Sequence, residues 1–275
     1  MRMRTLLGAT AAALTIVAAP AMAQDGEAQF EGFYVGGSVG YTVQNNDVGE
    51  RIDFDAGQNG TFGDTITTAA GADAFSPGFC NGAATGNANV ACTNDKDDIE
   101  YYGRIGFDKQ MGKIVVGAVA EFGKSEVRDS VTAFSTTPAY YTMTRELDWN
   151  GALRLRAGYV AGESTLFYAT GGGAYAKIDH SFSTSNGANS FAVTGDDEAW
   201  GWQAGGGIEQ KLGRNFSVGL EYLYSRYDDD DSRVAVGQGT AGATNPFVLA
   251  GGADFRRSTD RFDFHSLRAT AAFRF

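Results

Sequence analysis

The sequence contains little proline, almost no cysteine and no long apolar run beyond its first 23 residues. Only 4 of the 275 residues are Pro and 2 are Cys, whereas 38 are Gly and 12% are aromatic. Basic residues are the minority, 22 against 33 acidic ones, and they form no cluster. Because neutralising nucleic-acid phosphates requires clustered cations, this composition argues against a nucleic-acid partner. The lack of a second apolar run means that any membrane crossing by the rest of the chain must use strands.

The first residues have the pattern of an export signal. Arg2 and Arg4 precede an apolar run over residues 6–19, and Ala21-Met22-Ala23 follows with the small-x-small form that signal peptidase requires. The run has about 14 residues, whereas a membrane-spanning helix needs about 20. The sequence therefore predicts a signal peptide over residues 1–23 that is cleaved after Ala23.

Cys80 and Cys92 are the only cysteines. Exported chains enter compartments where thiols oxidise, so we expect these two residues to form a disulfide within one loop. A metal site would need further ligands, and no His or second Cys pair lies near them in the sequence.

Eight segments alternate between apolar and small or polar residues with a period of two, as β-strands do. Each has about 10 or more residues, which is enough to cross a bilayer when tilted. The segments are 33–43, 99–108, 113–127, 146–160, 164–180, 199–210, 215–227 and 261–275. A soluble sheet would show the same alternation, so the period alone does not decide the fold.

The connections between these segments alternate strictly between long and short. Tight turns are expected at 109–112, 161–163 and 211–214, and long connections at 44–97, 128–145, 181–198 and 228–260. The three prolines beyond the signal peptide, Pro77, Pro138 and Pro246, all lie in long connections. This asymmetry is typical of outer-membrane barrels. It predicts one all-β domain over residues 24–275, an eight-stranded antiparallel up-and-down transmembrane β-barrel with long extracellular loops.

Aromatic residues gather near the predicted strand ends, where they would form two belts at the membrane interfaces. For the periplasmic belt we expect Phe33, Phe107, Tyr159, Phe167, Phe216, Phe273 and Phe275. For the outer belt we expect Tyr41, Tyr101, Phe122, Trp149, Trp200, Trp202, Tyr222 and Phe262.

Four segments together resemble the OmpA-like outer-membrane barrel family, especially small porin-family surface proteins of alphaproteobacteria. These are Gly32-Phe-Tyr-Val-Gly-Gly, Leu166-Phe-Tyr-Ala-Thr-Gly-Gly-Gly-Ala-Tyr, Gly201-Trp-Gln-Ala-Gly-Gly-Gly-Ile-Glu and Leu220-Glu-Tyr-Leu-Tyr. The closing Ala272-Phe-Arg-Phe matches too. The resemblance implies that Phe275 is the signal read by the barrel-insertion machinery, after delivery by periplasmic chaperones. It also implies a location in the outer membrane of a Gram-negative cell.

Charged residues on the face opposite the apolar one should point into the lumen. They are Arg104, Asp108, Glu121, Asp148, Arg154, Arg156, Glu209, Glu221, Arg268 and Lys177. The interior of an eight-stranded barrel is just wide enough for side chains, so these charges must neutralise one another. We expect Glu209 and Glu221 to meet Arg154, Arg104 or Arg268, with Glu121 completing the balance. The set could form a structural plug or line a gated or leaky pore.

Motifs for catalysis, cofactors or metals are weak. His180 and His265 each precede a serine, but neighbouring strand residues point to opposite faces, so neither pair predicts a nucleophile with its base. No helix follows the glycine clusters 171–173 and 205–207 to form a phosphate cradle. The acidic runs at 95–98 and 228–231 lack the spacing of a calcium loop. We therefore expect no enzyme activity, no cofactor and no defined metal site.

The sequence as a whole predicts a monomeric integral outer-membrane barrel with a structural, envelope-integrity and surface-exposed role. Its expected surroundings are outer-membrane lipids and lipopolysaccharide. Two alternatives remain open, a narrow porin-like diffusion pore and a surface adhesin or ligand binder that acts through the extracellular loops.

Overall fold

The computed structural model describes residues 29–44, 49–80, 92–93 and 95–275. The predicted signal peptide and its cleavage site lie outside these residues. Strands make up most of the described chain, together with one short helix, α1 (Pro246–Leu249). No described helix is long and apolar enough to cross a membrane.

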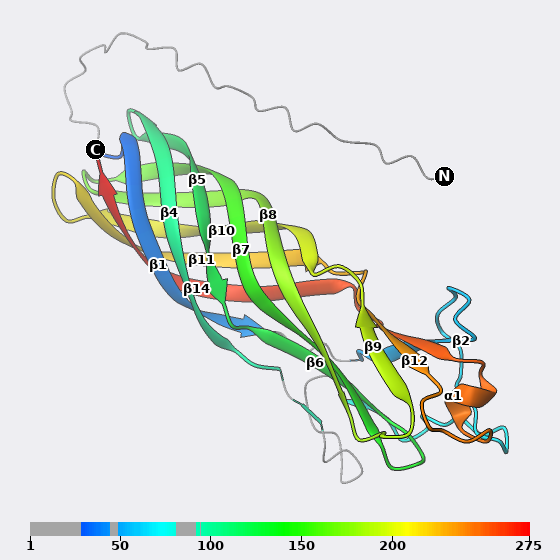
Figure 1. Cartoon of the computed structure of the whole chain (residues 1–275). Coiled ribbons are helices and arrows are strands. Elements are labelled where there is room, and N and C mark those ends of the chain that lie inside the picture. Colours follow the sequence, from blue (N-terminus) through cyan, green and yellow to red (C-terminus); the bar gives the residue numbers. More distant parts are fainter. Residues whose placement is uncertain (1–28, 45–48, 81–91, 94) are drawn as a thin grey trace, which may run out of the picture.

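Eight long antiparallel strands close into a barrel (Figure 1). In chain order they are β1 (Gly32–Gln44), β4 (Asp98–Met111), β5 (Ile114–Ser125), β7 (Tyr140–Ala161), β8 (Thr165–Thr184), β10 (Glu198–Lys211), β11 (Phe216–Asp228) and β14 (Arg261–Arg274). Each pairs with the next, and β14 returns to pair with β1. The predicted fold class is therefore confirmed, and the eight predicted segments correspond to the eight barrel strands.

Two of the periplasmic turns are tight because glycine permits a left-handed backbone. Gly112, between β4 and β5, and Gly162, between β7 and β8, each have φ of +63°. Residues with a Cβ rarely adopt this conformation, so glycine allows these strand pairs to reverse within a few residues.

The long connections, in which no strands were predicted, are folded. A short β3 (Gly78–Cys80) pairs with β6 (Arg128–Phe134), which pairs with the outer half of β7. Opposite them lies a second sheet in the order β2-β13-β12-β9. Its strands are β2 (Ile52–Ala56), β9 (Ser190–Thr194), β12 (Arg233–Gly237) and β13 (Ala253–Arg257). We use the name head for both sets of short strands (β3 and β6, and β2, β9, β12 and β13), together with α1 and the outer ends of β7 and β8.

The head has its own hydrophobic core between its two sheets. Val131 of β6 and Tyr141 of β7 belong to one cluster with Val234 of β12 and Phe255 of β13, and all four are almost fully buried. Phe75, from the first long connection, meets Tyr141 edge to face with ring centres 5.3 Å apart. Burial of such side chains contributes about 1.5–3 kcal/mol each, so the extracellular segments form a packed unit.

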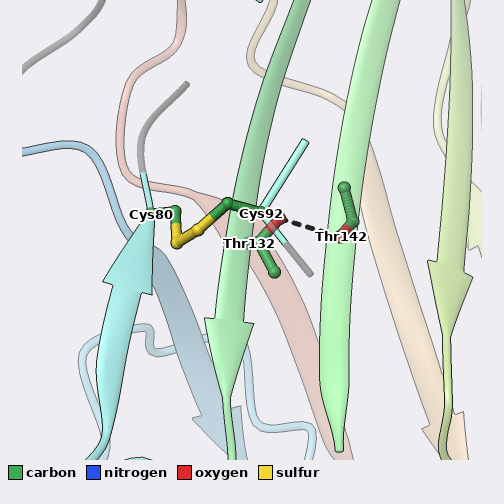
Figure 2. Close-up of a disulfide and its surroundings, with 4 residues drawn as sticks. All are labelled: Cys80, Cys92, Thr132 and Thr142. Carbon is green, nitrogen blue, oxygen red and sulfur yellow. Dashed lines mark hydrogen bonds between the residues drawn. A yellow bond between two sulfur atoms is a disulfide. The ribbon is translucent and has the colours of Figure 1, made fainter. Parts of the chain in front are cut away.

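The two cysteines join the first long connection to this unit. Cys80 is bonded to Cys92, with Cα atoms 5.9 Å apart (Figure 2). Cys80 pairs with Thr132 of β6, whose hydroxyl lies 2.8 Å from that of Thr142 on β7. The disulfide is therefore attached to the edge of the sheet that continues the barrel wall.

The outer surface of the barrel is apolar, as a lipid-facing surface must be. Leu153 and Leu155 on β7 are 65% and 70% exposed. Every aromatic residue expected in the periplasmic belt is exposed, and so are most of those expected in the outer belt. Trp149 is half-buried between Phe122 and Tyr175, and the placement of Phe262 was wrong. Phe262 points inward on the same face of β14 as Phe264, is fully buried, and lies 4.9 Å from the Arg145 guanidinium.

Candidate functional site

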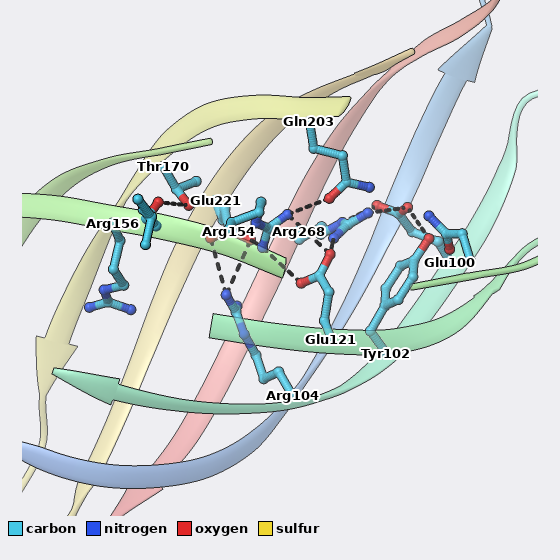
Figure 3. Close-up of polar contacts among 12 residues, drawn as sticks. Glu100, Tyr102, Arg104, Glu121, Arg154, Arg156, Thr170, Gln203, Glu221 and Arg268 are labelled. Carbon is cyan, nitrogen blue, oxygen red and sulfur yellow. Dashed lines mark hydrogen bonds and ion pairs between the residues drawn. The ribbon is translucent and has the colours of Figure 1, made fainter. Parts of the chain in front are cut away.

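A cluster of charged side chains crosses the middle of the lumen (Figure 3). Arg154 of β7 donates to both carboxylate oxygens of Glu121 of β5, at 3.0 and 2.8 Å. Arg154 also donates to Glu221 of β11 at 3.2 Å, and Arg104 of β4 donates to the same carboxylate at 3.2 Å. Arg268 of β14 donates to Glu121 at 2.7 Å. Because inward positions alternate along each strand, five different strands supply these groups to one level of the barrel.

Glu100 and Tyr168, which are not among the predicted lumen residues, also belong to this central cluster. Arg268 donates to both oxygens of Glu100 at 2.7 and 2.9 Å, and the Tyr168 hydroxyl donates to Glu221 at 2.8 Å. The inward alternation of the strand holding Arg104 could have indicated Glu100, which lies four residues earlier. Gly40 leaves room for the pair, since a Cβ there would lie 2.8 Å from Arg268 Cγ.

A second cluster lies toward the periplasmic end. Arg156 donates to Glu209 at 2.7 Å, and Arg274 donates to Asp108 at 2.8 Å and to Glu209 at 3.3 Å. Glu209 therefore does not join Arg154, Arg104 or Arg268, and that predicted pairing was wrong. The reason is position along the strand, because Glu209 lies opposite Gly219 of β11, near the periplasmic turn, rather than level with Glu221.

Phe30 lies beyond the second cluster, at the periplasmic end of the lumen. It is fully buried among Val115, Val160 and Leu166. Its backbone N–H donates to Gln110 at 2.8 Å. An apolar ring thus fills part of this end of the lumen, with Lys211 and Arg274 lying 6.0 and 5.8 Å from its centre.

The two lumen clusters are balanced in formal charge. The central cluster joins three arginines to three carboxylates, and the periplasmic cluster joins two arginines to two carboxylates. Removing an ion from water costs several kcal/mol unless an opposite charge and hydrogen bonds compensate. This balance allows the charges to be packed in a closed interior.

Asp148 and Lys177 do not point into the lumen, contrary to prediction. The strand register shifts between Leu147 and Trp149, and this irregularity turns Asp148 away from the interior. Lys177 shares the outward face of β8. The two side chains lie 3.7 Å apart and remain about one-third exposed.

A third charged group lies above the membrane-spanning region, where the barrel meets the head. Arg257 of β13 donates to Glu50 at 2.7 Å and to Asp129 of β6 at 2.7 Å. Arg145 of β7 donates to Asp129 at 2.8 Å and lies 3.3 Å from Asp229. We call this set the junction cluster. It connects the second head sheet to the wall of the barrel.

Glu50 of the junction cluster and two residues beside the cluster, His180 and Asp95, have shifted pKa values. His180 Nε2 lies 2.9 Å from Asp229, and Nδ1 lies 3.4 Å from Asp197. Burial lowers the pKa of His180, but the hydrogen bond and charge of Asp229 outweigh it, so the pKa is raised above its usual value. Burial raises the pKa of Glu50 to about 7, against the opposing charge of Arg257. Burial and the charge of Asp129 raise that of Asp95 to about 7.

The other sequence candidates occupy separate places. His265 lies on the outer face, 2.6 Å from the Tyr222 hydroxyl, whereas Ser266 is buried on the inner face. Asp95 accepts a hydrogen bond from the Ser130 backbone at 2.8 Å, and Asp97 accepts one from Gln44 at 2.8 Å. No group of three or more His, Cys, Asp or Glu able to hold a metal ion occurs among the residues that the structure describes.

Both glycine clusters lie inside barrel strands. A Cβ on Gly172 would lie 2.0 Å from the Leu153 carbonyl oxygen, and one on Gly205 would lie 2.0 Å from that of Tyr222. These glycines allow close approach between neighbouring strands, as their use in tightly curved sheets requires.

Comparison with known proteins agrees with this architecture. The model of the outer membrane protein beta-barrel domain family matches residues 65–275. The chain belongs to this family. The family member described here is therefore an outer-membrane β-barrel protein, and the resemblance noted from its sequence motifs is confirmed.

Relatives of this barrel protein occur in alphaproteobacteria. It is 32% identical over 121 residues to the 31 kDa outer-membrane immunogenic protein of Brucella melitensis, covering 44% of this chain and 50% of that protein. It is 29% identical over 126 residues to the 22 kDa outer membrane protein of Rhizobium leguminosarum bv. viciae, covering 46% of this chain and 51% of that protein. The chain thus spans about half the length of the curated relatives that it matches.

Among solved structures, the outer membrane protein OprG from Pseudomonas aeruginosa is similar with a TM-score of 0.48 and 14% identity. The match covers 90% of this chain and 97% of that chain.

Proposed function

We propose that this protein is a closed structural barrel that anchors a folded, surface-exposed head in the outer membrane. The observation that carries the proposal is the central cluster, in which the side chains of Arg154, Arg268 and Glu221 have no exposed surface. A diffusion pore instead needs wall charges that contact water and passing solutes.

Ion pairs that cross the lumen support a closed interior. Arg104 on β4 reaches Glu221 on β11, although β1 and β14 separate these strands in the wall. Arg154 on β7 reaches the same carboxylate from the opposite direction. Such pairs hold the walls together and occupy the path that a solute would take.

The packed head supports the surface-exposed part of the proposal. A loop that served only to connect strands would not need a shared core of Phe and Val side chains. The proposal includes outer-membrane lipids and lipopolysaccharide as the surroundings of a monomeric barrel. It also includes recognition of Phe275, which is 76% exposed at the strand end, by the insertion machinery.

Conductance in planar bilayers tests this function against the alternative of a narrow diffusion pore. We expect refolded protein to give no current above the lipid baseline. A double variant, Arg104→Ala with Glu221→Ala, should open a conducting path if the cluster is the plug. A difference in gel migration before and after heating serves as the insertion control for both proteins. Reproducible single-channel steps from the wild-type protein would overturn the closed-barrel function and favour the pore.

A further inference from the structure

Two arginines on the outer face of the head share one aromatic ring. The guanidinium carbon of Arg256 on β13 lies 4.2 Å from the centre of the Phe62 ring, and that of Arg233 on β12 lies 5.3 Å from it. Within the part of the chain that the structure describes, neither guanidinium lies within 4.0 Å of a carboxylate. The ring thus holds two unneutralised cations near each other.

Strand register explains why the two side chains meet. Val234 of β12 lies opposite Phe255 of β13, and both point into the head core. One step further in this antiparallel register, Arg233 and Arg256 lie opposite each other on the outward face. Like charges directly opposite in a sheet repel each other. Packing on Phe62 and the charge of Asp53, which lies opposite Arg256 on β2, offset part of this repulsion.

The lack of a carboxylate is unusual for this chain. Acidic residues outnumber basic ones, and among the described arginines all but Arg214, Arg233 and Arg256 have a carboxylate within 4.0 Å. Two carboxylates do lie on the same sheet face, but both have other partners. Asp53 binds Arg51 at 2.8 Å, and Asp254 accepts from Gln58 at 2.8 Å.

We propose that Arg233, Arg256 and Phe62 form an anion-binding site for phosphate or sulfate ester groups of an extracellular glycan. Guanidinium groups present paired N–H donors that match the oxygens of such groups, and stacking restricts the motion of the arginines before binding. The anion would neutralise the repulsion that the free head retains. The site lies on the solvent side of the second sheet, facing away from the head core.

The test is binding of dextran sulfate to the full-length protein in lipid nanodiscs, with uncharged dextran as the blank. We expect Arg233→Gln with Arg256→Gln to weaken binding at least tenfold and to reduce its dependence on salt. Arg214→Gln is the matched control, because it also removes an arginine without a carboxylate partner but in a periplasmic turn. It should leave binding unchanged.

Two further measurements keep the outcome decisive. The variant Arg233→Gln with Arg256→Gln should unfold within a few degrees of the wild type, because the inward-facing Val234 and Phe255 are unchanged, and this excludes misfolding as the cause of lost binding. Vesicles containing lipopolysaccharide, compared with phosphatidylcholine vesicles, test whether membrane phosphates are the source of the anion. If the double variant loses binding only to dextran sulfate, the ligand is a soluble polymer. If it loses binding only to lipopolysaccharide vesicles, the ligand is the lipid phosphates. Binding of both probes with wild-type strength by the double variant would overturn the site.

Discussion

Arg257 of β13 and Asp129 of β6 lie 2.7 Å apart, and this ion pair joins the two sheets of the head. Arg257 also binds Glu50, and Asp129 also binds Arg145 of the barrel wall. Because all four side chains are almost fully buried, removing one would leave a charge without its partner in a dry environment. The junction cluster therefore couples the fold of the head to the barrel.

Glu221→Leu should destabilise the barrel by about 3–5 kcal/mol, because Arg104 and Arg154 would lose a carboxylate inside the lumen. Urea unfolding in lipid vesicles measures the effect. Lys109→Leu is the control, since the Lys109–Glu31 pair is exposed and should contribute less than about 1 kcal/mol. A loss under about 1 kcal/mol for Glu221→Leu, together with altered current, would contradict the closed lumen.

The head should be more stable at pH 6 than at pH 8. The pKa of His180 is raised in the folded state, so its contribution is complete below its unfolded pKa and is lost as pH rises through the folded value. Glu50 and Asp95 have pKa values of about 7 in the folded state and therefore bind more protons when folded. They too lower the stability of the head as pH rises from their unfolded pKa values to about 7.

The pH effect can be measured by thermal unfolding at both pH values, followed through the aromatic signal of the head core, which contains Phe255. His180→Gln should reduce the difference, whereas His265→Gln, on the outer surface of the barrel, should leave it unchanged. Equal stability at the two pH values would rule out this linkage.

Replacing Cys80 and Cys92 with serine should destabilise the head but not the barrel. A closed ring of this size contributes on the order of 3 kcal/mol by limiting the unfolded chain. Limited proteolysis should then cleave the variant in its first long connection, while the eight barrel strands stay protected. Two titratable thiols in denatured, unreduced wild-type protein would show that the bond does not form in cells.

Wild-type protein should migrate at different positions on detergent gels before and after boiling. A closed ladder of hydrogen bonds leaves no edge at which detergent can begin unfolding, so the unheated barrel stays compact. Identical migration under both conditions would contradict a closed barrel.

The barrel could be predicted from sequence because its signals are long and repeated. Strands such as β11 alternate apolar and small or polar residues over ten or more positions, and Gly112 marks the turn between β4 and β5. The strands that lie only in the head have three to seven residues, too few for the same pattern to stand out, although Ile52 and Phe54 alternate with aspartates in β2. Alternation alone also cannot locate an irregularity, which is why Asp148 was assigned to the lumen.

Partners within the lumen were harder to predict than the inward positions. Arg154 and Glu221 were expected to lie close together, and they do. Glu209 was wrongly assigned to the same level of the lumen as Glu221. Its true height along the tilted wall depends on the register of every preceding strand pair. Such accumulated offsets are fixed by closure of the whole barrel and cannot be read from one strand.

β7 and β8, with 22 and 20 residues, run from the periplasmic turn into the head as single strands. At about 3.3 Å per residue they extend about 70 Å, well beyond the apolar band of about 25 Å. Figure 1 shows both strands continuing from the barrel to the region of β6 and β9. No flexible linker separates them from the bilayer-embedded wall. A force applied at the tip of the head is therefore transmitted to the membrane without a hinge, and the height and tilt of the exposed surface follow from those of the barrel.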